Sequence, residues 1–136
     1  MSGFSEKEIE YLRGQRLGRL ATVNSKGEPH VVPVAFRYND EIDAIDVGGH
    51  NFAKSKKYRD VRSNGRAAFV VDDVLPPWRA RGVEVRGRAE VLGTGGEEIG
   101  PGFEEDMIRI FPDRIVGWGI ESDASNRNGR SVGRTA

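Results

Sequence analysis

The segment from Val83 to Val91 alternates apolar or small residues with charged ones. The residues on one side of this alternation are Val83, Val85, Gly87, Ala89 and Val91, and those between them are glutamate or arginine. Successive side chains point to opposite faces of a β-strand, so a period of two predicts a strand with one buried and one solvated face. Such a strand is stable only within a sheet that covers its apolar face. The chain must therefore build its fold on a sheet.

Five further segments have the composition of strands: residues 17–23, 30–36, 44–48, 67–71 and 115–118. The first two flank a turn at residues 24–27 and predict a hairpin. Pro33 has no amide hydrogen, so the second strand should be an edge, or carry a bulge, at that point. Strands joined by hairpins favour a mainly β fold, an antiparallel barrel of six or so strands with short helices at its mouths.

Three helices are expected between these strands. Ser5 and Glu8 have the spacing of a capping box and predict a helix over residues 6–14. A second helix is expected over 52–62, with Ser55 as a plausible cap and a stop at residues 64–65. The apolar residues of 97–111 lie near helical spacing, which predicts a third helix that ends at Pro112.

The length of 136 residues suits one compact core. Residues 1–120 are therefore expected to form a single domain. Residues 121–136 consist largely of Ser, Asn, Gly and Arg without apolar periodicity, which predicts a flexible tail.

Composition excludes several kinds of site. The 21 basic and 21 acidic residues balance, which argues against a whole-protein grip on nucleic acid or on an anionic membrane. No cysteine is present, which removes disulfides, iron–sulfur clusters and cysteine nucleophiles and fits a reducing, cytoplasmic location. With only two histidines, no metal site is expected. No apolar run has the length of a membrane span.

Charge is concentrated in two stretches. Residues 54–66 hold six basic residues against one acid, and residues 97–106 hold five acids and no base. The acidic run is typical of a solvated helix start. Lys56 and Lys57 would lie in the first turn after a Ser55 cap, where the helix dipole disfavours cations. A bound phosphate would compensate them, whereas side chains that extend into water would need no ligand, and both interpretations stay open.

Two glycines, Gly48 and Gly49, lie at the end of the strand at 44–48. A pair of residues without side chains lets a flat ligand, or another backbone, approach closely.

The order of these motifs resembles a known family. The strand and turn residues 20–34, Gly48, the run from Ser55 to Arg62 and the segment 66–70 are similar to the pyridoxamine phosphate oxidase-like flavin and deazaflavin family. The segments 82–91 and 114–119 resemble its actinobacterial branch, which uses coenzyme F420. The resemblance extends over about residues 17–119.

This resemblance implies a split β-barrel homodimer with a deazaflavin or flavin in a groove between subunits. By position, Ser55, Lys57 and Arg59 would hold the phosphate region with Lys56 as a neighbour, and Val32, Pro33, Val34 and Gly48 would line the ring. Asp60 departs from the asparagine common in the family and brings a negative charge near this phosphate.

The expected function is that of an F420-dependent oxidoreductase, which passes a hydride from the reduced deazaflavin to a small conjugated or electrophilic organic substrate. The cofactor carries this chemistry, so no catalytic acid or base is required, and His30 and Tyr58 are interpreted as structural. Two alternatives remain: an FMN enzyme of the same family, and a non-enzymatic F420 carrier.

Overall fold

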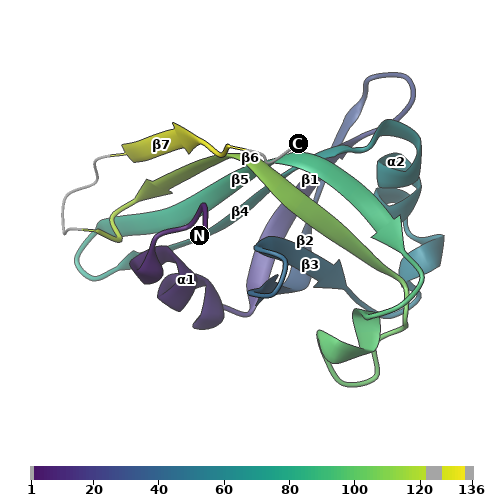
Figure 1. Ribbon diagram of the computed structural model, residues 1–136, viewed down its shortest axis with the longest axis horizontal. Helices are drawn as coiled ribbons and strands as arrows, with labels where there is room; N and C mark the ends of the chain where they lie inside the picture. Colours follow the sequence, from purple (N-terminus) through teal and green to yellow (C-terminus); the bar gives the residue numbers. More distant parts are fainter. Residues whose placement is uncertain (1, 122–126, 134–136) are drawn as a thin grey trace.

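The computed structural model describes residues 2–121 and 127–133. Its strands are β1 (Leu17–Val23), β2 (Pro29–Asn39), β3 (Ala44–Gly48), β4 (Arg66–Leu75), β5 (Arg79–Leu92), β6 (Met107–Trp118) and β7 (Arg127–Ser131). They pair in the order β3-β2-β1-β4-β5-β6-β7, and an additional pairing of β3 with β6 closes the first six into an antiparallel barrel (Figure 1). The predicted mainly β barrel is confirmed.

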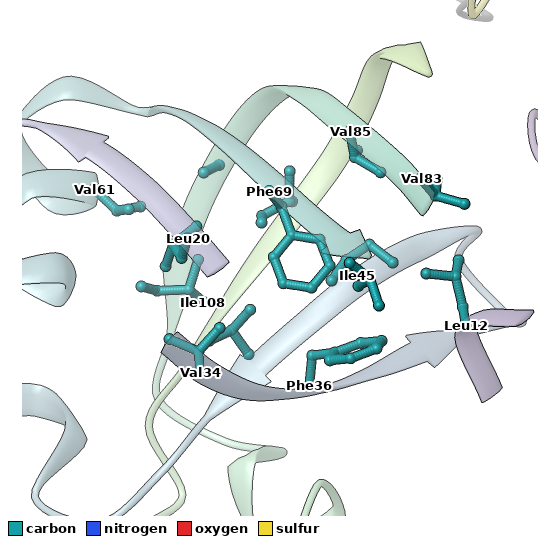
Figure 2. Close-up of a cluster of buried hydrophobic side chains, with 14 of the residues drawn as sticks. Leu12, Leu20, Val34, Phe36, Ile45, Val61, Phe69, Val83, Val85 and Ile108 are labelled. Carbon is teal, nitrogen blue, oxygen red and sulfur yellow. The ribbon is translucent and has the colours of Figure 1, made fainter. Parts of the chain in front are cut away.

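The barrel interior is filled by apolar side chains from all six strands (Figure 2). The alternation along β5 is confirmed, since Val83, Val85 and Ala89 are buried while Arg86 and Arg88 are exposed. Phe36 and Phe69 meet edge to face across the core, with ring centroids 5.1 Å apart. Since the interior is occupied by side chains, a ligand of cofactor size has to bind outside the barrel.

The predicted hairpin of β1 and β2 is also confirmed, with a register that runs from Leu17 opposite Ala35 to Val23 opposite Pro29. Pro33 pairs with Arg19 of β1, and β3 joins the other side of β2 only from Ala35 onward. Pro33 therefore lies where β2 pairs with a neighbour on one side only, a position that tolerates a residue without an amide hydrogen.

A buried charge cluster supports the seam where β3 and β6 close the barrel. Asp46 is fully buried, and its carboxylate accepts hydrogen bonds from Arg109 Nε (2.8 Å) and Arg109 Nη2 (3.2 Å). Asn39 Nδ2 donates to the same carboxylate at 2.9 Å. This bonding raises the pKa of Arg109. Without these two partners the buried Asp46 carboxylate would lack compensation for its charge.

The two α-helices lie toward opposite ends of the molecule (Figure 1). Helix α1 (Glu6–Arg13) begins with the predicted capping box: Ser5 Oγ accepts from Glu8 N, and Glu8 Oε1 accepts from Ser5 N. The predicted helix at 52–62 is a 3-10 turn, η1 (Phe52–Lys54), followed by α2 (Lys56–Asn64). Gly65 ends α2 in the left-handed conformation at φ 77°. Among the described residues, no helix is long and apolar enough to cross a membrane.

The prediction of a helix over residues 97–111 is wrong. Only a 3-10 turn, η2 (Gly96–Glu98), forms there, and Met107 begins the long strand β6, which continues through Pro112 to Trp118. The register against β5 shifts between Arg86 and Gly87, so Pro112 lies at a bulge, where a residue without an amide hydrogen is tolerated. Pairing with β3 and β5 on either side outweighed the local near-helical spacing.

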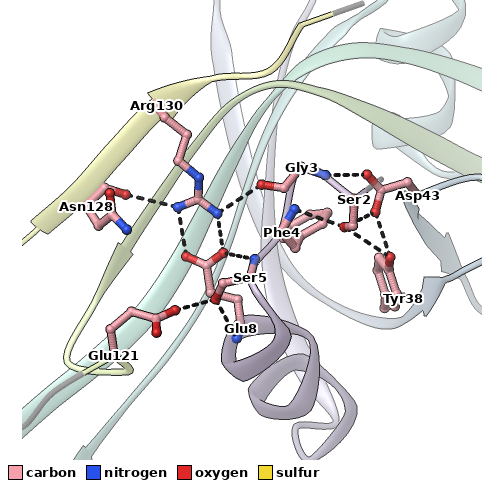
Figure 3. A network of polar contacts seen from close by, with 10 residues as sticks. All are labelled: Ser2, Gly3, Phe4, Ser5, Glu8, Tyr38, Asp43, Glu121, Asn128 and Arg130. Atoms are coloured by element: carbon pink, nitrogen blue, oxygen red, sulfur yellow. Dashed lines mark hydrogen bonds and ion pairs between the residues drawn. The ribbon is translucent and has the colours of Figure 1, made fainter.

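Part of the predicted flexible tail is ordered as β7, which pairs with β6. Arg130 of β7 forms an ion pair with the buried carboxylate of Glu8 in α1 and donates to the Gly3 carbonyl (Figure 3). The remaining tail positions, 122–126 and 134–136, lie outside the described residues.

Candidate functional site

Helix α2 begins after η1, in the connection that follows β3, and Ser55 organises this start. Ser55 Oγ accepts from Tyr58 N at 3.4 Å and donates to the Phe52 carbonyl at 2.6 Å. The predicted cap is confirmed, and the single hydroxyl hydrogen is already committed to η1. Ser55 therefore fixes the junction of η1 and α2 and uses the Tyr58 amide, which leaves the amides of Lys56 and Lys57 at this end for an anion.

Lys57 is the most distinctive side chain at this start. Its Nζ lies 4.8 Å from the centroid of the buried Phe52 ring, and the side chain is partly buried. Burial lowers the pKa of Lys57. Within the described part of the chain, Lys57 has no carboxylate within salt-bridge distance. A partly desolvated ammonium without a counter-ion fits the anionic group expected here.

Lys56 and Arg59 differ from Lys57 in their surroundings. Lys56 Nζ lies 3.4 Å from Asp60 Oδ1 one turn later, so its charge has an internal partner. Arg59 is exposed at the surface. The structure thus brings the predicted phosphate residues to one helix start but gives each a different environment.

Asp60 is buried, and it anchors α2 to the barrel. Thr22 Oγ1 of β1 donates to Asp60 Oδ2 at 2.8 Å, and both residues are buried. Sequence reasoning placed the Asp60 charge near the phosphate but missed its link to Thr22. The alternation of β1, which directs Thr22 inward with Leu20, was the available signal.

The double glycine is approached by another part of the chain. A Cβ on Gly48 would lie 3.0 Å from Ile99 Cδ1 and 3.4 Å from Phe103 Cδ2. The Gly49 carbonyl accepts from Glu104 N at 3.2 Å. Of the two possibilities that the glycines left open, a close backbone and side-chain approach is the one that the structure shows. Gly48 is buried beneath the segment 96–106, which we call the acidic loop.

The acidic loop is not the solvated helix start expected from its composition. Glu104 Oε1 accepts from Phe52 N at 2.6 Å, Tyr58 Oη donates to Asp106 Oδ1 at 3.2 Å, and Glu98 pairs with Arg37 at 3.2 Å. Burial raises the pKa of Tyr58, with Asp106 adding to the effect. Tyr58 therefore serves as a structural donor, as the sequence indicated. The contacts at Phe52 and Tyr58 join the acidic loop to η1 and α2.

The predicted ring-lining residues of β2 divide between the two faces of the sheet. Val34 is buried in the core and Val32 packs against it, whereas Pro33 is exposed on the outer face. Alternation along a strand requires this division. Pro33 and the free edge of β2 are thus the parts of this segment that a ligand can reach. Val32 and Val34 pack on the core side of the strand instead.

An open pocket of about 640 Å³ lies away from α2. It is bounded by α1, the β4–β5 turn and residues 119–121. Its Tyr11 hydroxyl donates to Asp73 at 2.9 Å, and Arg81 Nε donates to the same carboxylate oxygen at 2.7 Å, so these polar groups are already paired. Within the described residues, no group of three or more His, Asp or Glu side chains is placed to hold a metal ion.

Comparison with known proteins identifies the family from which this arrangement comes. Residues 4–130 match the pyridoxamine 5'-phosphate oxidase family, which is nearly the whole chain. The chain belongs to that family. It is also 51% identical over 124 residues to a 5a,11a-dehydrotetracycline/5a,11a-dehydrooxytetracycline reductase of Streptomyces rimosus subsp. rimosus. That match covers 90% of this chain and 87% of the reductase.

Solved structures share the fold of this family member. The conserved hypothetical protein Rv2991 from Mycobacterium tuberculosis superposes with a TM-score of 0.67 at 24% identity, covering 85% of this chain and 84% of that one. A FAD-binding protein from Mesorhizobium loti superposes with a TM-score of 0.62 at 24% identity, covering 84% of this chain and 94% of that one. At this identity the likeness concerns the barrel alone.

Proposed function

We propose that this chain is an F420-dependent oxidoreductase that reduces a small conjugated or electrophilic organic substrate. The observation that carries the proposal is the partly buried Lys57 ammonium, which has no acid partner among the described residues and lies at the capped start of α2. A bound phosphate would neutralise an ammonium in this setting and would also accept hydrogen bonds from amides in the first turn of α2.

The residues at the start of α2 fit the anionic part of such a cofactor. Lys57 and Arg59 would supply charge, Ser55 would hold the helix start in place, and Lys56 lies beside them. Pro33 and the free edge of β2 would meet the flat ring. Since the barrel interior is filled, the ring would lie on the outer face, in a groove completed by a second copy of the chain.

When bound, the deazaflavin supplies the hydride, and the protein contributes position, charge and exclusion of water. Lys57 and the α2 amides would hold the anionic end of the cofactor, and this contact would fix the position of the cofactor on the protein. The outer face of β2 presents Pro33 and the exposed Val31, which are apolar and would keep water from the ring.

The Streptomyces relative supports the reaction class, because its name describes the reduction of a dehydro compound. We therefore include 5a,11a-dehydrotetracycline among the candidate substrates of this chain, beside simpler enones and quinones. We assign the reaction to the cytoplasm, since a chain without cysteine suits a reducing compartment.

Titration of the purified protein with F420 and with FMN tests the cofactor. The proposal expects tighter binding of F420, and tighter binding of FMN would favour an FMN enzyme of the same family. Lys57→Met should weaken the binding of whichever cofactor is preferred. Lys26→Met is the matched control, because Lys26 is exposed in the β1–β2 turn.

Turnover separates an enzyme from a carrier. Reduced F420 is mixed with each candidate substrate, and its oxidation is followed by absorbance. Protein-dependent oxidation with at least one substrate supports the enzyme. Tight F420 binding without oxidation by any member of the panel would instead favour a non-enzymatic carrier.

A further inference from the structure

Two neighbouring lysines at the start of α2 have opposite surroundings, and a single buried carboxylate accounts for the difference. Asp60 is only 4% exposed. It accepts a hydrogen bond from Thr22 Oγ1 at 2.8 Å and pairs with Lys56 Nζ at 3.4 Å. A buried carboxylate needs such partners, so Lys56 is held by a group that cannot turn away to solvent.

Lys57 points along a different direction. Residues i and i+4 of a helix share a face, which aligns Lys56 with Asp60, whereas the next residue is rotated by roughly 100°. Lys57 Nζ accordingly lies over the Phe52 ring at 4.8 Å and has no carboxylate partner among the described residues. One lysine is paired inside the protein and the other is available to an anion.

We propose that Asp60 is a positioning residue that partitions the two lysines between an internal role and a ligand-binding role. It neutralises Lys56 and docks α2 on β1, so that Lys57 is the principal lysine that binds the anionic group. The affinity for that group is therefore lower than two available cations would give. This inference rests on the proposed function, because it concerns the same cofactor site. It assigns to Lys56 a much smaller share in binding than its place in the sequence indicates.

The chain offers substitutions that separate the charge of Asp60 from its structural role. Asp60→Asn keeps an oxygen that accepts from Thr22 but removes the charge that holds Lys56. Thr22→Val removes the buried donor but keeps the carboxylate and its pairing with Lys56. A role limited to docking predicts similar effects of both, whereas a role in partition predicts tighter anion binding by Asp60→Asn and no such gain by Thr22→Val.

The experiment measures dissociation constants for F420, FMN and inorganic pyrophosphate by calorimetry at two salt concentrations. The variants are Asp60→Asn, Thr22→Val, Lys56→Met, Lys57→Met and the double variant Asp60→Asn/Lys56→Met. Circular dichroism establishes that each variant is folded. The acylation rate of each lysine, measured by mass spectrometry without ligand, gives a second readout that does not depend on a cofactor.

Asp60→Asn should bind the anionic ligands about two- to fivefold more tightly, the effect of freeing one partly solvated charge, with a steeper salt dependence. Lys56→Met should abolish this gain in affinity when it is combined with Asp60→Asn. In the native protein, Lys56→Met should change the affinity much less. Lys57→Met should cost at least about tenfold in both backgrounds. Acylation of Lys56 should accelerate in Asp60→Asn and stay unchanged in Thr22→Val.

The possible failures are distinguishable. Equal losses from Lys56→Met and Lys57→Met in the native background, or weaker binding by Asp60→Asn, would overturn the partition while the cofactor site stands. A native protein that binds none of the three ligands would overturn the proposed function. In that case, unchanged Lys56 acylation in Asp60→Asn would also refute the pairing itself.

Discussion

At the scale of single residues, Lys57 combines burial with charge, and this combination makes its ligand affinity sensitive to pH. Burial lowers the pKa of Lys57, so its ammonium loses the proton at a lower pH than an exposed lysine does. The attraction for an anion is complete below this lowered pKa and disappears as the pH rises through it.

We therefore expect cofactor affinity to fall on the alkaline side earlier than an ordinary lysine would allow. Lys57→Ala should weaken binding at neutral pH by about 1.5–3 kcal/mol, the range for a hydrogen bond to a charged group. Lys57→Arg should retain affinity into the alkaline range, because a guanidinium stays protonated. Fluorescence titrations between pH 6 and about 10 measure both effects, and parallel profiles for native protein and Lys57→Arg would assign the pH dependence to another group.

Gly87 is a second residue whose identity is fixed by its surroundings. A Cβ there would overlap the Phe111 carbonyl oxygen at the β5–β6 bulge and lie 2.9 Å from Asp113 N. Gly87→Ala should destabilise the fold by about 1–3 kcal/mol or more, as overpacking does. Gly93→Ala is the control, because nothing lies within 4 Å of a Cβ at that position. Urea unfolding compares the two, and equal stabilities would mean that the bulge relaxes without cost.

At the scale of elements, α1 and β7 are joined by one ion pair (Figure 3). The Glu8 carboxylate is 1% exposed, and it caps its own helix while pairing with Arg130. This pairing raises the pKa of Arg130. The side chains of β7 itself are mostly exposed, so apolar packing contributes little to its attachment.

Arg130→Met should therefore cost about 2–4 kcal/mol of stability, because it leaves a buried carboxylate with its capping bonds alone. The double variant Glu8→Gln/Arg130→Met should recover part of this loss, since the remaining group is uncharged. Hydrogen exchange of β7 amides and urea unfolding measure the two consequences. A loss below about 0.5 kcal/mol would show that the pair behaves as an exposed salt bridge.

At the scale of the whole molecule, the outer face of the β1–β2 hairpin exposes apolar side chains. Leu17 is 57% and Val31 66% exposed, and Pro33 lies on the same face between their positions in the ladder. Arg19 lies opposite Pro33 on this face, and its charge is paired with Asp72. A face of exposed apolar side chains next to the proposed cofactor position is where a second copy would bind in the homodimer that we propose.

Val31→Asp should shift the protein from dimer to monomer, because it places a charge within an apolar interface. It should also weaken cofactor binding in proportion, since the groove needs both copies. Sedimentation velocity at several concentrations measures the first effect, with Ile42→Asp as an exposed control outside the hairpin. A native protein that sediments as a monomer at every concentration would contradict this arrangement.

Much of this molecule follows from short stretches of its sequence. The alternation in 83–91 specified β5, the Ser5 and Ser55 caps specified the starts of two helices, and Gly65 specified the end of α2. The hairpin of β1 and β2 and the edge at Pro33 followed in the same way. Each of these features depends on steric limits and hydrogen bonds between residues close in the chain, so the local sequence contains the relevant energies.

Tertiary structure decided the rest. β6 replaced an expected helix because strands on both sides pair with it, and the acidic loop covers Gly48 from about fifty residues away along the chain. The different environments of Lys56 and Lys57 depend on Asp60, and that carboxylate is buried where α2 packs on the barrel and accepts a hydrogen bond from Thr22 of β1. Contacts between distant segments determine these outcomes, and such contacts stabilise the structure only when the barrel has closed.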